Sequence, residues 1–262
     1  MNCVTVQSVS PYGENMSDIT SIPVEVAHAV DAAGLGQLIA AFPESSDATG
    51  SGVTAALMRA SHKASNDDRN GVFVYQNGVI WQRRRKNKHS VDGWETERLD
   101  QFRWADIAEF TQSSHRTVTA SGFTTTTHSF WFTLRDGRRF DISRDGQHSS
   151  KVACFSGLER FAATVDPLVT AAQIPLAEQA LQRGEKVGCG LLSVDVNGVY
   201  WARNFLAWPD LEEMAFSNGS VVIRKRGKRR KWIAVSTSRV ANLSLLLAIT
   251  RALGAQHGAR LP

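Results

Sequence analysis

Short runs of β-branched and aromatic residues fill two stretches of the chain, and each stretch closes with apolar residues at helical spacing. The first predicts strands over 72–75, 79–81, 102–110 and 118–134, then a helix over 150–165 that stops before Pro167. The second predicts strands over 187–196, 199–202, 211–216, 221–226 and 231–235. A last helix follows, which Ser236 or Ser238 can cap. We expect an α+β protein with antiparallel strands.

Glycine-containing dipeptides mark hairpin turns between these strands, at Asn77-Gly78, Asp136-Gly137, Asn197-Gly198 and Asn218-Gly219. Asn-Gly is favoured in two-residue type I′ turns, which require positive φ at both positions. The pattern therefore predicts that Asn77 and Gly78 themselves occupy the first turn and that the return strand begins at Val79.

Two motifs occur twice, which predicts a tandem duplication. Asn-Gly-Val-x-Trp spans 77–81 and 197–201, and Trp-x-Asp-(Ile/Leu)-x-Glu spans 104–109 and 208–213. Because a duplicated module needs the same packing twice, core roles are favoured for Trp81, Trp104, Trp201 and Trp208. Asp106 and Asp210 are expected to cap or brace a turn. The first copy has about 16 more residues between its two motifs, an insertion expected to form a loop.

These repeats predict modules over 70–167 and 186–254, joined by a helical linker over 168–185 that Pro175 splits. Residues 1–23 are expected to form a flexible leader, and residues 255–262 a polar tail. The segment 24–69 predicts an amphipathic helix over 24–42, a loop over 43–52 and a short helix over 53–63.

Several strands followed by one helix is the element order of pleckstrin-homology (PH) domains. The chain resembles a family of uncharacterised actinobacterial proteins with tandem PH-like domains. The resemblance covers roughly 24–253 and rests on these residues: Gly34-Leu35-Gly36, Ala41-Phe42-Pro43, the two Asn-Gly-Val hairpins, Trp104-Ala105-Asp106-Ile107, Trp208-Pro209-Asp210-Leu211 and Asn242-Leu243. It implies two PH-like modules, each an antiparallel β-barrel or sandwich capped by a C-terminal helix. PH-like domains bind phosphoinositides, acidic lipids or protein segments, and the resemblance carries over no catalytic residue.

Positive charge is concentrated in the duplicated part. The chain has a net charge of +5, but residues 1–60 hold six acidic residues and one basic one, which leaves 29 bases against 19 acids in the rest. A basic surface favours phospholipid headgroups, nucleic acid or acidic proteins as partners. The alternative is that the charge only keeps the protein in solution.

Two cationic clusters are candidate anion-binding sites. The first holds Arg83, Arg84, Arg85, Lys86 and Lys88, and the second holds Arg224, Lys225, Arg226, Lys228, Arg229, Arg230 and Lys231. Arginine forks bind two phosphate oxygens at once. The alternatives are a solvated loop for the first cluster and a sheet edge protected by charge for the second. Trp232 beside the second cluster could stack on a nucleic-acid base, and Trp94 in the insertion is a candidate exposed contact residue.

The remaining residues suggest no catalytic or metal chemistry. Histidines lack the spacing of a metal site, and no cofactor is expected. Cys3, Cys154 and Cys189 are odd in number and scattered, which fits a reducing cytoplasm and no disulfide framework. Cys154 and Cys189 are expected to fill cores. No stretch is long and apolar enough to cross a bilayer.

The sequence thus favours a non-enzymatic cytoplasmic binding or scaffold protein. Its PH-like modules would engage an acidic lipid surface or a protein partner, with a peripheral place at the membrane in the lipid case. The alternative is sequence-independent nucleic-acid binding through the basic hairpin 224–231.

Overall fold

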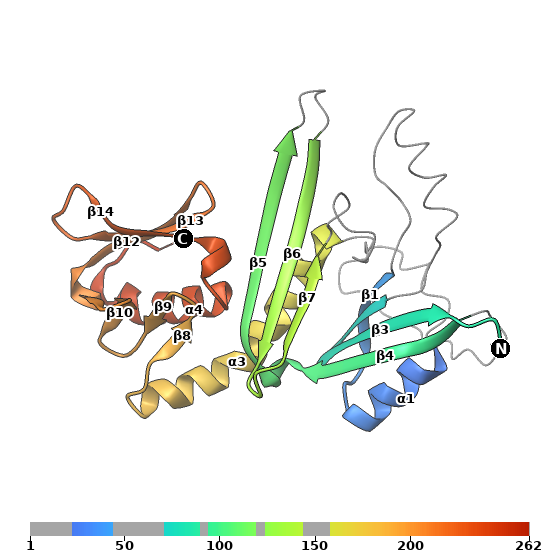
Figure 1. The fold of residues 1–262 in the computed structure, drawn as a ribbon. Helices are drawn as coiled ribbons and strands as arrows, with labels where there is room; N and C mark the ends of the chain where they lie inside the picture. The colour runs from blue at the N-terminus through green and yellow to red at the C-terminus, as the bar shows by residue number, and fades with distance from the viewer. Residues whose placement is uncertain (1–22, 44–70, 90–93, 119–123, 144–157, 262) are drawn as a thin grey trace. The chain divides into compact units, whose positions relative to one another are not determined.

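The computed structural model describes residues 23–43, 71–89, 94–118, 124–143 and 158–261 (Figure 1). The chain divides into two compact units. Unit 1 comprises residues 1–104 and 143–165, and unit 2 comprises residues 105–142 and 166–262. The predicted leader over 1–22, loop over 44–52 and helix over 53–63 lie outside the described residues, as do Cys3 and Cys154.

Unit 1 contains one antiparallel sheet and a helix. The sheet has the order β1-β2-β3-β4, and the elements are α1 (Val24–Ala33), β1 (Leu38–Pro43), β2 (Gly71–Tyr75), β3 (Gly78–Lys86) and β4 (Trp94–Arg103). Helix α1 covers one face, where Val26, Leu35 and Ile80 are fully buried together. On another side, Phe42 meets Phe161, from the first turn of helix α3 (Leu158–Gln182), edge to face at 5.1 Å.

Unit 2 contains three antiparallel sheets, with the orders β5-β6-β7, β11-β10-β9-β8 and β12-β13-β14. The first is built from β5 (Ile107–Val118), β6 (Thr124–Leu134) and β7 (Arg139–Ser143). The others are built from β8 (Val187–Cys189), β9 (Leu192–Val194), β10 (Gly198–Trp201), β11 (Asn204–Ala207), β12 (Leu211–Ser217), β13 (Ser220–Lys225) and β14 (Lys231–Ser236). One helix, α4 (Leu243–Gly254), follows the strands, and short 3-10 turns η1 (Trp104–Asp106), η2 (Trp208–Asp210), η3 (Thr237–Arg239) and η4 (Ala255–His257) connect elements.

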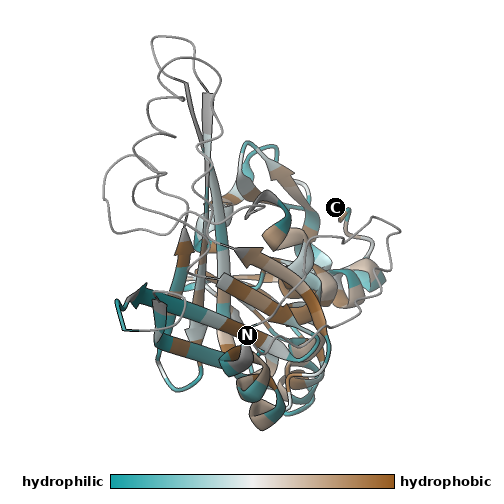
Figure 2. Cartoon of the chain, turned by 90° about the vertical axis from the view of Figure 1, so that its right-hand side faces the viewer, coloured by the Kyte–Doolittle hydropathy of each residue, from teal (hydrophilic) through white to brown (hydrophobic). Residues whose placement is uncertain are grey.

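The core of unit 2 is one continuous apolar cluster. Its fully buried members include Trp208, Leu211, Met214, Val199 and Leu246, drawn from two sheets and from α4. Cys189 is also fully buried in it, so its predicted role as a core filler is confirmed. Figure 2 shows stretches of apolar residues along the strands and polar residues toward several hairpin ends.

The order of elements repeats along the chain. Four strands of one sheet, a 3-10 turn, three strands of a second sheet and a helix occur first as β1 to α3 and again as β8 to α4. The protein is therefore α+β with four antiparallel sheets and a C-terminal helix, as the sequence pattern indicated. Among the described strands no sheet closes into a barrel.

The predicted helix over 24–42 is only half helix. Gly34 ends α1 in the left-handed region at φ 63°, and Gly36 follows with φ 77°. Glycine reaches such angles without steric cost, so the chain reverses here. Leu38–Pro43 then pairs with β2 as a strand.

The Asn77-Gly78 turn was predicted wrongly. Gly78 pairs with Tyr75, so the turn is formed by Gln76 and Asn77, and neither Asn77 nor Gly78 has a positive φ. Glycine is needed at 78 for another reason: a Cβ there would lie 2.4 Å from the Phe102 carbonyl oxygen. The same close approach occurs at Gly198, 2.2 Å from the Leu206 oxygen. Only Asn218-Gly219 has positive φ at both residues, as type I′ requires.

Three predicted strands are interrupted. The strand expected over 118–134 is divided between two strands, since Val118 ends β5 and pairs with Thr124 of β6. The strand expected over 102–110 is broken by η1, and the strand over 187–196 is a hairpin in which Gly190 has φ 68°. A Cβ on Gly190 would lie 2.5 Å from the Arg239 oxygen, so this turn fits tightly against the backbone of η3.

Two predicted helix boundaries were also wrong. Helix α3 runs unbroken through Pro167 and Pro175. Proline inside a helix costs about 3 kcal/mol, but buried Val165 and Val169 anchor the helix on either side of Pro167. Ser236 and Ser238 do not cap the last helix, because η3 intervenes and α4 begins after Asn242.

Candidate anion-binding surfaces

The repeated tryptophans hold matching places in the two halves. The Trp104 amide donates to the Asn77 oxygen at 3.1 Å, and the Trp208 amide donates to the Asn197 oxygen at 3.1 Å. Each indole also donates to a backbone oxygen, Trp104 to Tyr75 at 3.0 Å and Trp208 to Asp195 at 3.1 Å. Both rings are at most 2% exposed. Their core role is confirmed, and neither is available to stack on a ligand.

An arginine binds each of the 3-10 turns η1 and η2 in the same way. In unit 2, the Arg135 amide donates to the Asp106 oxygen and its Nε donates to the Ala105 oxygen at 3.1 Å. The Arg226 amide donates to the Asp210 oxygen and its Nε donates to the Pro209 oxygen at 3.1 Å. The aspartates take part through their backbone oxygens, and it is the arginines that brace these turns; the Asp210 carboxylate pairs with Lys225.

Arg226, a candidate anion-binding residue, is therefore a structural residue. Its Nη2 donates to the His257 oxygen at 2.9 Å and to the Leu211 oxygen at 3.3 Å, in addition to the bond with Pro209. Arg135, its counterpart in the first half, was not singled out from the sequence. Only alignment of the two halves on their Trp-x-Asp motifs would have found it.

The first cationic cluster lies mostly on a strand. Residues 83–86 belong to β3, and β3 and β4 have nine and ten residues against four each for β10 and β11. The insertion therefore lengthens a hairpin, in which Arg85 pairs with Glu95 and Lys86 with Trp94. The loop that the sequence predicted begins only after Lys86.

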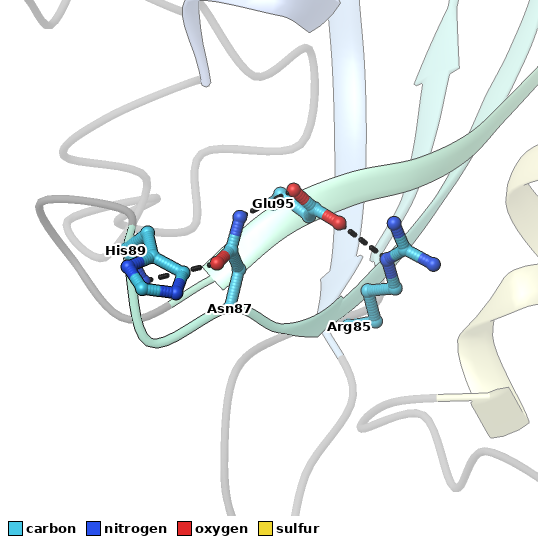
Figure 3. A network of polar contacts seen from close by, with 4 residues as sticks. All are labelled: Arg85, Asn87, His89 and Glu95. Carbon is cyan, nitrogen blue, oxygen red and sulfur yellow. Dashed lines mark hydrogen bonds and ion pairs between the residues drawn. The ribbon is translucent and has the colours of Figure 1, made fainter.

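Within this cluster several charges are engaged. Arg85 forms an ion pair with Glu95, which also accepts a 2.5 Å bond from Asn87 Nδ2, while Asn87 Oδ1 accepts from the His89 amide (Figure 3). Hydrogen bonds from Arg85 and then Asn87 lower the pKa of Glu95, so this carboxylate stays charged beside the cluster.

The other members of the first cluster differ in availability. The Arg83 guanidinium stacks 4.2 Å from the centre of the Trp81 ring. Arg84 is half-buried and Lys88 is exposed. The side chains of Lys86 and Trp94 lie outside what the structure describes, so the predicted exposure of Trp94 stays a prediction. The cluster therefore contains one neutralised arginine and one stacked arginine.

The second cluster has two parts: residues near the start of the hairpin whose charges are paired with acidic residues, and a tip whose charges are not paired within the described part of the chain. Arg224 pairs with Glu213 at 2.9 Å and Lys225 pairs with Asp210 at 3.0 Å. Beyond Gly227, which turns the chain at φ 70°, the next four residues are exposed. We name these four the β13–β14 tip: Lys228, Arg229, Arg230 and Lys231. Within the described residues their side chains make no ion pair or hydrogen bond.

Trp232 next to the tip is half-buried and packs against the unit 2 core. Alternation along β14 places Trp232 on the face opposite the buried Ile233 and Val235, so only part of its ring reaches the core cluster. The ring is thus partly occupied by core contacts and does not stand free for stacking.

The sequence matches the model of DUF6585, a family of unknown function, over residues 53–258. The chain belongs to the DUF6585 family. It matches no curated protein and no solved structure. The DUF6585 match takes in both copies of the tryptophan motifs and both cationic clusters. The expected membership of an uncharacterised family is confirmed, whereas its actinobacterial origin and its PH likeness stay predictions.

Two other titratable groups of this DUF6585 protein, Cys189 and Asp166, have their pKa raised by burial. Burial, with a smaller contribution from Glu109, raises the pKa of Cys189 to about 12, so its thiol stays protonated. Burial also raises the pKa of Asp166, which accepts a hydrogen bond from Ser244. Among the described residues, no three His, Cys, Asp or Glu side chains gather as metal ligands, and no helix could cross a membrane.

One shallow hollow of about 290 Å³ lies in unit 2, away from the β13–β14 tip. It is lined by Glu109, Thr111, Gly190, Leu191, Ser238, Arg239 and Ala241. No member of either cationic cluster lines it.

Proposed function

We propose that this chain is a non-enzymatic binding protein built from two tandem PH-like modules, and that the β13–β14 tip attaches it to an acidic lipid surface. The observation that carries the lipid proposal is the contrast within one cationic cluster. Arg224, Lys225 and Arg226 are tied to partners of the fold, whereas the four tip residues present their charge to solvent.

The PH-like part rests on the repeated order of four strands, three strands and a helix. It is supported by matching bonds at Trp104 and Trp208 and at Arg135 and Arg226. Such bonds depend on backbone positions in both copies, so they are strong support for one ancestral module. Fold alone does not assign a ligand, and the tip therefore carries the functional step.

The charge of the tip favours membrane attachment. Each Lys or Arg near an anionic leaflet contributes about 1 kcal/mol, so four contribute about 4 kcal/mol, roughly a thousandfold in partition coefficient. Salt screens exposed charges, so binding should fall steeply with ionic strength. The side chains can reach headgroups without breaking an internal ion pair.

Vesicle co-sedimentation tests this proposal. We expect binding to vesicles containing phosphatidylserine at low salt and none to pure phosphatidylcholine. Replacing all four tip residues with alanine should abolish most of the binding. The matched control removes the same charge from four ion-paired arginines elsewhere: Arg98, Arg138, Arg183 and Arg260. Equal loss in both variants, or equal binding to neutral and anionic vesicles, refutes a role for the tip.

Nucleic-acid binding is the competing outcome. The half-buried Trp232 removes the stacking surface that this alternative would use. A gel shift with double-stranded DNA at the same salt concentration decides between them. In a competition experiment, DNA is added to protein bound to anionic vesicles. If DNA releases the protein when the concentration of DNA phosphate is still below that of the anionic lipid, the lipid assignment is wrong.

A further inference from the structure

The outer faces of two four-stranded sheets can be compared through the Asn-Gly-Val-x-Trp repeat. Successive strand residues point to opposite faces. Ile80 follows the buried Val79, and Tyr200 follows the buried Val199, so the two residues lie on equivalent faces of their sheets. Ile80 is 0% exposed because α1 covers it. Tyr200 is half-buried, and it is not among the residues of the core cluster in which α3 and α4 pack against this sheet.

The covered face of unit 1 shows how the helix is held. Leu35, just after α1, lies 2.8 Å from where a Cβ on Gly78 would be, so it fills the space that this glycine leaves. Arg103 donates from Nε and Nη2 to the Ala33 oxygen at 3.1 and 2.8 Å. A cation thus binds the C-terminal end of the helix, where the macrodipole is negative.

The face in unit 2 is apolar but open. Phe205 lies opposite Tyr200, with ring centres 4.8 Å apart, and its ring edge is 2.8 Å from where a Cβ on Gly198 would be. It thus fills the space that Leu35 fills in unit 1, yet 48% of it is exposed. The counterpart of Phe205 in unit 1 is the exposed, polar Gln101. Contiguous exposed apolar surface marks protein-interaction sites, and here the facing rings of Phe205 and Tyr200 form it.

The chemistry around this face favours an acidic occupant. The Lys186 ammonium lies 3.5 Å from the centre of the Tyr200 ring, and Arg203 is exposed in the turn between β10 and β11. Two acids lie near these cations in the chain: Glu185 is paired with Arg183, and the Asp195 carboxylate is turned inward, where it accepts from the Tyr200 hydroxyl and from the Asn197 and Gly198 amides. The rim is therefore cationic. Helix α1, which covers the equivalent face, carries Glu25 and Asp31 and no Lys or Arg.

We propose that the open β8–β11 face, centred on Tyr200 and Phe205, docks an acidic amphipathic helix of a partner protein. Apolar residues of that helix cover Phe205 and Tyr200, and its carboxylates pair with Lys186 and Arg203. Helix-on-sheet docking of this kind uses i, i+3 and i+4 anchors. The proposal uses the equivalence of the two sheets and not the lipid assignment, so the two fail separately.

The probe is a synthetic peptide with the sequence of residues 23–37, since that segment already fits a face of this kind. We expect amide shifts of the full chain, in two-dimensional NMR, at Gly188, Ser193, Tyr200 and Phe205. Phe205→Asp should weaken peptide binding at least tenfold, and Lys186→Glu with Arg203→Glu at least fivefold. Phe216→Asp is the matched control, because Phe216 is exposed to a similar degree (45%, against 48% for Phe205) but lies on β12, and it should leave binding unchanged.

Three results would overturn the proposal. The first is the absence of shifts at millimolar peptide, and the second is shifts confined to Gly78, Val79 and Ile80, which would mean that the peptide only displaces α1. The third is a dimer in sedimentation that Phe205→Asp dissociates, because a second copy would then occupy the face. Vesicle binding of Phe205→Asp should equal that of the unchanged chain, which separates this site from the tip.

Discussion

Asn242 offers the sharpest test of how unit 2 is held together. It is 5% exposed and has φ 51°. Its backbone amide donates to the Phe110 carbonyl oxygen at 2.7 Å. In the side chain, Oδ1 accepts from the Phe110 backbone amide at 2.8 Å, and Nδ2 donates to the Ala108 carbonyl oxygen at 2.8 Å. The side chain therefore satisfies the outer edge of β5 and does not cap the helix that follows.

Asn242→Ala should destabilise the protein through two separate effects. The Phe110 amide, in a residue only 3% exposed, loses its acceptor, and a buried unsatisfied donor costs about 1–3 kcal/mol. Alanine in the left-handed region costs about 1 kcal/mol more. The expected total is about 2–4 kcal/mol. Asn242→Gly should recover about 1 kcal/mol of this, because glycine removes only the backbone penalty.

Asn218→Ala is the matched control. Asn218 has φ 50° but is exposed at the β12–β13 turn, and its side chain makes no hydrogen bond within the described residues. Its loss should be about 1 kcal/mol. Urea unfolding gives the totals, and hydrogen exchange of the Phe110 amide reports the lost bond directly. If Asn242→Ala costs no more than Asn218→Ala and Phe110 exchange is unchanged, the proposed role of Asn242 is wrong.

Three further predictions follow from the geometry. Gly198→Ala should lower the free energy of unfolding in urea by about 1–3 kcal/mol, because the new Cβ would meet the Leu206 oxygen. Gly188→Ala should leave it unchanged, since a Cβ there would have nothing within 4 Å. Equal effects of the two substitutions would contradict the close-approach argument. The Asp195 hydrogen bond raises the pKa of Tyr200 above its ordinary value of 10.0, so titration at 295 nm should show a late tyrosine that Asp195→Asn shifts down. Because the folded pKa is raised, this stabilisation is complete below about pH 10 and is lost as the pH rises past the folded value. With Cys3 and Cys154 replaced by serine, the buried Cys189 should resist Ellman's reagent at pH 8 until urea is added, and rapid reaction in the native state would show that its thiol is accessible.

Much of the architecture was predictable from local patterns. Alternation and turn residues identified β2, most strands of unit 2 and the Asp136-Gly137 hairpin, because these depend on neighbours in sequence. The paired tryptophans were recognised as core residues from their repetition alone. Their indole bonds to the Tyr75 and Asp195 oxygens explain why the repeats retain them.

The candidate sites were predictable only as runs of charge. The sequence shows seven cations near Gly227, but it does not show that Glu213 and Asp210 neutralise two of them or that Arg226 binds three backbone oxygens. Those partners are distant in the chain or across a strand pair. The same holds for Arg85, which Glu95 neutralises from the opposite strand.

By itself, then, the sequence determined the β-rich α+β plan, the excess of basic residues and the turns at Asp136-Gly137 and Asn218-Gly219, since each follows from composition or short-range periodicity. Tertiary structure decided why Gly78 and Gly198 are glycines, that Leu38–Pro43 is a strand, which cations stay free and which sheet face lacks a cover. Each of these depends on what another part of the chain places within a few ångströms, and such contacts are set by packing between distant segments rather than by local preference.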